Sequence, residues 1–254
     1  SVTDCAVTLK AIAGHDPKDR YSATRFVPDY LAGLNGDING IRIGIVKEAI
    51  DADFIQPEVK RTIETAIKHL SEIGADVTNV SIPLLHYSAA VTRTIMEVEA
   101  ASTHRSWLRT RPQDYEHNVL TDLLTGCIIP AELYYKAQKI RHLIRGQVIS
   151  ALDSVDVLAL PASSEPAPKI KTKAGTESKQ EALLGVTGRR SLCSPFNLSN
   201  VPALVVPCGF VNTTGKEMPI GLQLAGRPFS DGMLLNVGYA YEQSTPWHRK
   251  RPPI

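Results

Sequence analysis

The chain has 254 residues, of which 43% are hydrophobic and 21% are charged, the profile of a folded globular protein. Its net charge of +2 provides no broad basic field, which excludes the usual electrostatic signal of nucleic-acid or anionic-membrane binding. No apolar run approaches the roughly 20 residues that span a bilayer, and the first residues lack the features of a signal peptide. We therefore expect a cytoplasmic protein with no membrane partner, and nucleic acid is not favoured as a partner.

The cysteines and histidines show no pattern typical of a metal site. The four cysteines are scattered without CxxC pairs, and the seven histidines form neither an HxxxH nor an HExxH pattern. We expect reduced, partly buried thiols, and neither a metal nor a cofactor.

The first predicted element is a helix over residues 1–13, whose apolar side chains recur at helical spacing. Ser1 and Asp4 fit the capping-box pattern, with Asp4 near the positive end of the helix dipole. An alternative is that Ser1 is a nucleophile with its own α-amine as the base. Because the cap already accounts for this serine, we favour the capping role. Turn residues then predict a loop over 16–40.

A strand, a helix and a second strand are predicted next. Residues 41–46 alternate like a strand, Pro57 suits the first turn of a helix that ends before Gly74, and residues 75–82 form the second strand. Such a unit places its two strands parallel. The apolar face of the helix consists of Val59, Ile63, Ala66, Ile67, Leu70 and Ile73.

The middle of the chain is predicted to be mainly helical. A helix over 86–110 precedes an irregular polar stretch over 111–117, and a turn is expected at 125–130. A long helix then begins at Pro130. Its apolar stripe includes Leu133, Ala137, Ile140, Ile144, Val148 and Ala151.

A short apolar strand over 155–160 ends at Pro161, and a polar loop follows over 162–179. The lysines at 169, 171 and 173 are interpreted as solvated rather than phosphate-binding, because no aromatic residues are interleaved with them.

Two further strands and a helix are predicted after this loop. The nearly unbroken apolar run 201–206 suits a strand buried on both faces, which Pro207 to Gly209 end or kink. Alternation over 220–225 predicts an antiparallel partner strand. Ser230 and Asp231 are expected to cap a final helix, with inward side chains at Met233, Leu234, Val237 and Tyr241.

Three linked motifs near the end, PFNLSNVPALVVPCGF, PIGLQLAGRPFSDGMLL and YEQSTPWHRKRP, resemble the C-terminal end of the amidase signature family. The segments SVTDCAVTLKAIAGHDPKD, QPEVKRTIETAIKHLSEIGADV and DVLALPASSEPAPKI resemble the same family, so the likeness covers essentially the whole chain. It implies an α/β fold, with a mixed central β-sheet flanked by helices on both faces. It also implies that residues 1–254 are the C-terminal portion of a single amidase signature domain, with the N-terminal portion and its nucleophile loop absent.

The resemblance implies amide hydrolysis by a serine nucleophile, a neutral lysine base and a second serine that relays the proton, a Ser-Ser-Lys triad. A glycine- and serine-rich loop supplies N–H donors to the oxyanion. This sequence contains no GGSSGGS-like run and no GxSxG elbow, so we assign no catalytic residue to it. We expect the chain to be inactive without its N-terminal portion.

What the resemblance assigns to this chain is a wall of the substrate pocket, formed by the turn 125–130, the loop at Pro161 and the segment 190–197. The candidate substrate-binding residues are Ile128, Pro161, Arg190, Ser191, Ser194 and Phe196. Arg190 is of particular interest, since a guanidinium suits a carboxylate on the substrate. A simple exposed arginine is an equal alternative, and Ile128, Leu192 and Phe196 fit a core role as well.

One branch of the family transfers ammonia from glutamine to a tRNA-bound glutamate. That branch has an arginine a few residues before the Gly126 position and an acidic residue just upstream of the Pro195 position, where this chain has Asp122 and Arg190. The departure favours hydrolysis of a small carboxamide to carboxylate and ammonia. The alternatives are the A subunit of a tRNA-dependent glutamine amidotransferase and a non-catalytic subunit that completes a partner's active site.

The expected partners are a small-molecule amide and the missing N-terminal portion. Half of a shared sheet leaves an edge and an apolar face uncovered, so we expect the chain by itself to aggregate or form a homodimer.

Overall fold

One five-stranded sheet forms the centre of the molecule, in the order β2-β1-β3-β5-β4. The computed structural model describes residues 1–168, 192–213 and 215–251. In this part, β1 runs parallel to β2 and β3, whereas β5 runs antiparallel to β3 and β4. The predicted mixed sheet is therefore confirmed. The strands are β1 (Arg42–Val46), β2 (Asp76–Val80), β3 (Val157–Pro161), β4 (Ala203–Thr213) and β5 (Lys216–Gly226).

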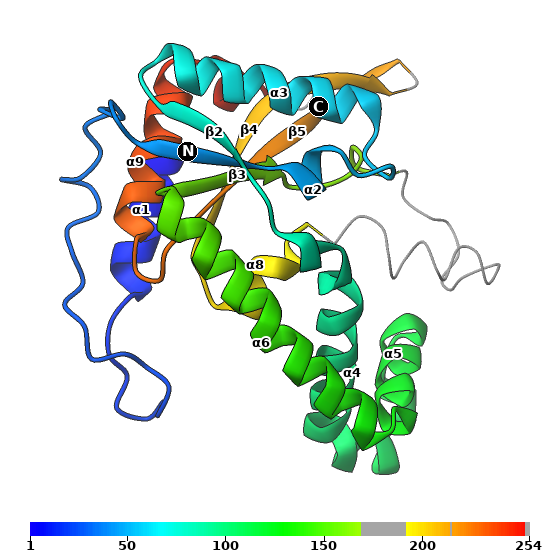
Figure 1. The fold of residues 1–254 in the computed structure, drawn as a ribbon. Helices are drawn as coiled ribbons and strands as arrows, with labels where there is room; N and C mark the ends of the chain where they lie inside the picture. Colours follow the sequence, from blue (N-terminus) through cyan, green and yellow to red (C-terminus); the bar gives the residue numbers. More distant parts are fainter. Residues whose placement is uncertain (169–191, 214, 252–254) are drawn as a thin grey trace.

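Helices cover both faces of this sheet, as the family resemblance implies (Figure 1). Helices α3 and α9 lie on one face, where the His69 and Tyr241 rings meet edge to face at 5.8 Å, and α1 packs against α9. Helices α6 and α8 lie on the other face, and α4 and α5 extend away from it. The helices are α1 (Val2–Ile12), α2 (Lys47–Ile50), α3 (Pro57–Glu72), α4 (Ser88–Thr110), α5 (His117–Ile128), α6 (Ala131–Ser154), α8 (Ser194–Ser199) and α9 (Asp231–Gln243).

Two helix starts follow directly from the sequence. Ser1 and Asp4 form the predicted capping box of α1, in which the Ser1 hydroxyl accepts the Asp4 N–H at 3.2 Å. Pro57 occupies the first turn of α3, where its missing N–H costs nothing. The predicted apolar face of α3 is buried from Val59 to Leu70 and packs on the sheet.

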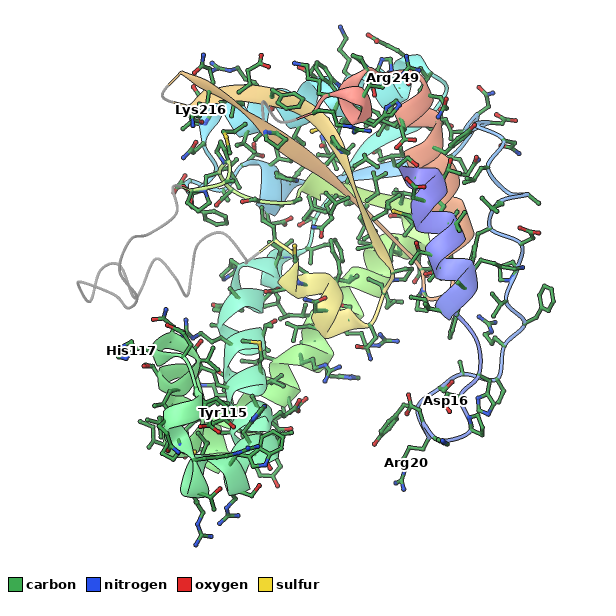
Figure 2. All side chains as sticks on the ribbon, turned by 180° about the vertical axis from the view of Figure 1, so that it is seen from behind. Asp16, Arg20, Tyr115, His117, Lys216 and Arg249 are labelled. Carbon is green, nitrogen blue, oxygen red and sulfur yellow. The ribbon has the colours of Figure 1, made fainter. Side chains whose placement is uncertain are left out.

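The β4–β5 hairpin departs from its prediction. The run 201–206 was expected to be buried on both faces, but β4 begins at Ala203, lies at the sheet edge and leaves Val205 49% exposed. The expectation was wrong because apolar composition shows β propensity, not which strand lies at the edge. Pro207 does not end the strand. The pairing register shifts between Pro207 and Gly209, and this bulge is an irregularity that an edge strand tolerates. Figure 2 shows Lys216 at the tip of the β4–β5 hairpin, far from Tyr115 and His117, which lie between α4 and α5 and at the start of α5.

Three further expectations were wrong in detail. The turn at 125–130 is largely helix, since α5 continues to Ile128. Leu133 is 49% exposed, because the first turn of α6 lies beyond the sheet. Ser230 does not cap α9 through its side chain, since its hydroxyl donates to the carbonyl of Arg227 at 2.8 Å.

Over the described ranges, no helix is both long enough and apolar enough to cross a membrane.

Candidate functional site

The site is built around the end of β3, which is the most deeply buried strand. All five residues from Val157 to Pro161 are buried, and Pro161 pairs with Leu222 of β5. The chain then turns at Ala162, whose N–H donates to the carbonyl of Gly221 at 3.0 Å. In open sheets of this kind, ligands bind outside the carboxyl ends of the parallel strands. The end of β3 is therefore a reasonable position for one wall of a pocket.

Helix α8 lies beside this strand end. Ser194 and Phe196 are buried, at 5% and 2% exposure, and α8 packs on α6 and α4. The Cys193 thiol donates to the carbonyl of Ala162 across 3.6 Å, which joins the start of α8 to the loop after β3. Burial raises the pKa of the Cys193 thiol, so this group stays protonated and neutral at pH 7. The residues that follow Pro161 and precede Ser194, Ala162 and Cys193, are thus in contact.

Ile128 behaves differently, because its side chain is 80% exposed at the end of α5. The helix packs on α4 through Gly126, where an added Cβ would overlap the main-chain carbonyl of Glu97. The interpretation of Ile128 as a core residue is therefore wrong for this chain, whereas Leu192 and Phe196 are in the core.

A charged cluster joins α4 to α5 near this exposed helix. The Arg93 guanidinium donates to the Glu97 carboxylate on its own helix and to Asp122 Oδ1 on α5 at 3.0 Å. Glu97 is only 4% exposed, and burial raises its pKa despite the opposing effect of Arg93. Asp122 thus has a structural partner in Arg93, which accounts for its presence without a substrate.

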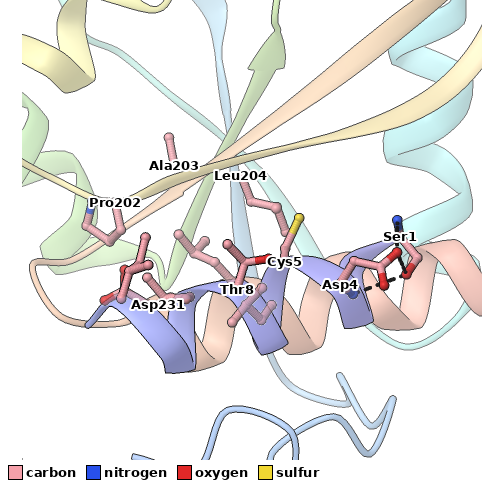
Figure 3. Close-up of a pocket in the computed structure, with 12 residues that line it drawn as sticks. Ser1, Asp4, Cys5, Thr8, Pro202, Ala203, Leu204 and Asp231 are labelled. Atoms are coloured by element: carbon pink, nitrogen blue, oxygen red, sulfur yellow. Dashed lines mark hydrogen bonds and ion pairs between the residues drawn. The ribbon is translucent and has the colours of Figure 1, made fainter. Parts of the chain in front are cut away.

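A separate groove of about 560 Å³ lies between α1, α9 and the start of β4 (Figure 3). Its lining is mainly apolar and includes Cys5, Leu9, Leu204 and Leu235, while Ser1 and Asp4 bond to one another at its end. It brings together no group of catalytic side chains. We therefore interpret it as uncovered packing surface.

The described residues hold no group of three or more His, Cys, Asp or Glu side chains placed to bind a metal. The four cysteines, all within the described ranges, are unpaired.

Known proteins resemble this chain over its whole length. A family model described as Amidase matches residues 1–235. The chain belongs to the amidase signature family. The A subunit of the glutamyl-tRNA(Gln) amidotransferase from Thermosynechococcus vestitus is 34% identical over 278 residues, which cover 100% of this chain and 56% of that protein.

Solved structures of amidase signature proteins show the same fold. The A subunit of the glutamyl-tRNA(Gln) amidotransferase from Thermotoga maritima superposes with a TM-score of 0.75 at 28% identity, covering 97% of this chain and 51% of that one. A 6-aminohexanoate cyclic dimer hydrolase gives a TM-score of 0.80 at 23% identity, covering 99% and 55%, a likeness of fold alone. The chain spans about half the length of the relatives that it matches.

Two of the candidate residues suggested by the amidase signature resemblance, Arg190 and Ser191, lie outside the described residues, as do the lysines at 169, 171 and 173. Sequence reasoning also missed one residue next to the site, Gln223. Its side chain is 2% exposed in β5 and donates to the carbonyl of Leu192 at 2.9 Å. The signal was present, since a glutamine stands between Leu222 and Leu224 in an otherwise apolar strand. The alternation predicted the strand but not the partner of this glutamine, which is the main chain just before α8.

Proposed function

We propose that this chain is the C-terminal part of a serine-nucleophile amidase that hydrolyses a small carboxamide to a carboxylate and ammonia. The observation that carries the proposal is the junction of β3 and α8 in an amidase signature chain. There the main chain after Pro161 is joined to the start of α8 through Cys193 and Ala162. In the proposal, this junction forms the wall against which the acyl group of the substrate rests.

The reactive groups belong to the other part of the proposed enzyme. Its serine oxygen forms a bond to the amide carbon, and the C–N bond breaks as the nitrogen takes up a proton and leaves as ammonia. Water then cleaves the acyl ester and returns the proton to the serine. The carbonyl oxygen of the amide in the first step, and of the acyl ester in the second, becomes an oxyanion that N–H donors of the nucleophile loop in the other part stabilise. The contribution of this chain is the position of the acyl group.

The candidate residues have different roles in this proposal. Ala162, Ser163 and Cys193 are partly accessible, so they provide surface next to the buried Pro161. Ser194 and Phe196 are buried and fix the direction of α8 beneath that surface. Ile128 and the unassigned Arg190 and Ser191 complete the proposed substrate-binding set. A carboxylate on the substrate would pair with Arg190.

The second candidate function is that of the A subunit of a glutamine amidotransferase, favoured by the 34% identity to such a protein. One observation counts against this alternative. At position 122, where the amidotransferase branch has an arginine, this chain has Asp122, whose carboxylate accepts a hydrogen bond from Arg93. In this alternative, the ammonia released from glutamine passes to a tRNA-bound glutamate.

The test is to produce this chain together with an N-terminal half that carries the nucleophile serine and to measure ammonia release. The substrates are a panel of small carboxamides and, separately, glutamine. We expect turnover of small carboxamides by the combination and none by either part. Turnover of glutamine but of none of the small carboxamides would favour the amidotransferase. Ligand binding by this chain without any turnover would favour a non-catalytic module.

A further inference from the structure

Gln223 is a buried polar residue in β5, and its side-chain amide has a hydrogen-bond partner outside the sheet. Gln223 pairs in register with Leu160 of β3 and Val205 of β4, so its side chain leaves the middle of the sheet. It reaches Leu192, just before α8, and donates a 2.9 Å hydrogen bond to the main-chain carbonyl. A buried amide without such a partner is destabilising, because its N–H donors lose water and gain no acceptor. The segment before α8 is therefore held at one point from the sheet.

The other end of α8 is held from α6. Arg141 donates through Nε to the carbonyl of Leu198 at 3.0 Å and through Nη2 to Asn200 Oδ1 at 3.2 Å. Asn200 adopts a left-handed conformation with φ of 52° and ends the helix. A cation at the C-terminal end of a helix also interacts favourably with its free carbonyls. Two long polar side chains thus hold α8 from opposite ends.

Between these two contacts lies the proposed wall. Phe196 fills the core beneath α8, and the Cys193 thiol faces the carbonyl of Ala162 just after β3. Apolar packing of Phe196 alone is non-directional and tolerates small shifts along the helix axis. The hydrogen bonds of Gln223 and Arg141 are directional, and they fix where Cys193 lies relative to β3.

We propose that Gln223 is a positioning residue for the proposed substrate wall, with Arg141 as its counterpart at the other end of α8. Gln223 acts through the carbonyl of Leu192 on the placement of Cys193 and Ser194. The role in catalysis rests on the proposed amidase function, whereas the placement of the segment does not. Leucine has a similar volume but no donor, so Gln223→Leu isolates the hydrogen bond.

The first test measures the reactivity of Cys193 toward an alkylating reagent, followed peptide by peptide by mass spectrometry. Because each cysteine is read separately, the same measurement serves this chain and any longer protein that contains it. We expect Gln223→Leu to raise the alkylation rate of Cys193 by about tenfold, since local opening by 1.4 kcal/mol changes a population tenfold. The rate at Cys208, buried in β4 at 4% exposure, should not change.

Cys208 and a matched variant serve as controls. Gln113→Leu makes the same change at an exposed glutamine in the short turn Pro112–Asp114, and it should alter neither cysteine. If Gln223→Leu raises the alkylation rate of Cys208 as well, this variant has lost its fold, and the Arg141 variants test the proposal instead. Arg141→Met should then raise the rate at Cys193, and Arg141→Lys, which keeps a donor and the charge, should restore it in part. An unchanged rate at Cys193 in Gln223→Leu with Cys208 protected, or in Arg141→Met, overturns the proposal.

The second test uses the assembled amidase, in which Gln223→Leu should raise KM by about tenfold for a carboxamide that is turned over, with the pH profile of kcat unchanged. Loss of folded enzyme would lower the apparent kcat and leave KM as it was, so the two effects are separable. An increase in Cys193 reactivity without a change in KM would support the placement role and contradict the wall. No turnover by the assembled wild-type protein would count against the proposed function alone.

Discussion

The carboxylate of Glu242, at the end of α9, accepts a hydrogen bond of 2.9 Å from the main-chain N–H of Val2, at the start of α1. Both residues are buried, and they are separated by almost the whole chain. The bond satisfies one of the free N–H groups of α1 with a charged acceptor, close to the positive end of the helix dipole. It therefore joins the first helix to the last one.

We expect Glu242→Ala to lower the free energy of unfolding by about 2–3 kcal/mol, because it leaves a buried N–H without a partner. Glu242→Gln keeps an acceptor and should cost about 1 kcal/mol. Urea denaturation followed by circular dichroism measures both. As a control, Glu64→Gln removes an exposed carboxylate 4.0 Å from Lys60 and should change stability by no more than about 0.5 kcal/mol. Equal effects at 242 and 64 would contradict the role of the buried bond.

The close approach of α4 and α5 gives a second prediction. Gly126→Ala should lower stability by about 2–3 kcal/mol or displace α5, because the new Cβ would overlap the carbonyl of Glu97. Gly146→Ala is the matched control, since its Cβ would meet nothing within 4 Å and lies in α6. This second change should raise stability by about 0.5–1 kcal/mol. Opposite signs in thermal unfolding are expected, and two changes of the same sign would count against the packing described.

The buried thiol of Cys208 gives a dependence on pH. Burial raises the pKa of this thiol from 9.0 to about 12. The unfolded thiol loses its proton near pH 9 while the folded one keeps it, so the unfolded state binds fewer protons above that pH. The stabilising contribution is full below pH 9 and falls between pH 9 and 12, by about 1.4 kcal/mol per pH unit.

Denaturation at a series of pH values from 8 to 11 measures this slope. Burial also raises the pKa of Tyr241, whose hydroxyl donates to the Cys208 carbonyl at 3.3 Å, so part of the slope will remain in Cys208→Ala. Cys5→Ala, at an exposed cysteine, should leave the slope unchanged. A slope in Cys208→Ala as steep as in the wild type would refute the assignment to the thiol.

The uncovered part of β4 leads to a prediction about association. Val205 is 49% exposed on the edge strand β4, and we expect this chain by itself to associate through this uncovered part of the sheet. Val205→Lys should shift the population toward monomer in size-exclusion chromatography with light scattering. Val119→Lys, on α5, changes an equally exposed valine and should not. A monodisperse wild-type monomer at all concentrations would contradict this expectation.

Much of the fold could be predicted because its signals are local. The capping box at Ser1 and Asp4, the proline that opens α3 and the periodicity of its apolar face each act within a few residues. The parallel pairing of β1 and β2 followed from the helix that connects them. The predictions failed where distant contacts decide the outcome. The sequence predicts a turn at Gly126, whereas the structure packs this glycine against α4. The sequence predicts a buried Val205, whereas the structure places β4 at the sheet edge.

The candidate site was less predictable than the fold. Pro161, Ser194 and Phe196 were singled out through a family resemblance, and the structure buries all three and joins their neighbours Ala162 and Cys193. The partners of α8 were not foreseen, because Gln223 and Arg141 make their bonds to main-chain carbonyls. Every residue has such a carbonyl, so side-chain identity at Leu192 and Leu198 shows no trace of the contact.

The proline within β4 has a consequence for how copies of this chain could meet. Amyloid-like growth requires an unbroken ladder of donors along an open strand. Pro207 removes a donor midway along this one, and the irregularity at Gly209 changes the alignment of the groups that follow. Growth by strand addition is thereby interrupted, so clusters of this protein should stay small and dissolve on dilution rather than mature into fibres.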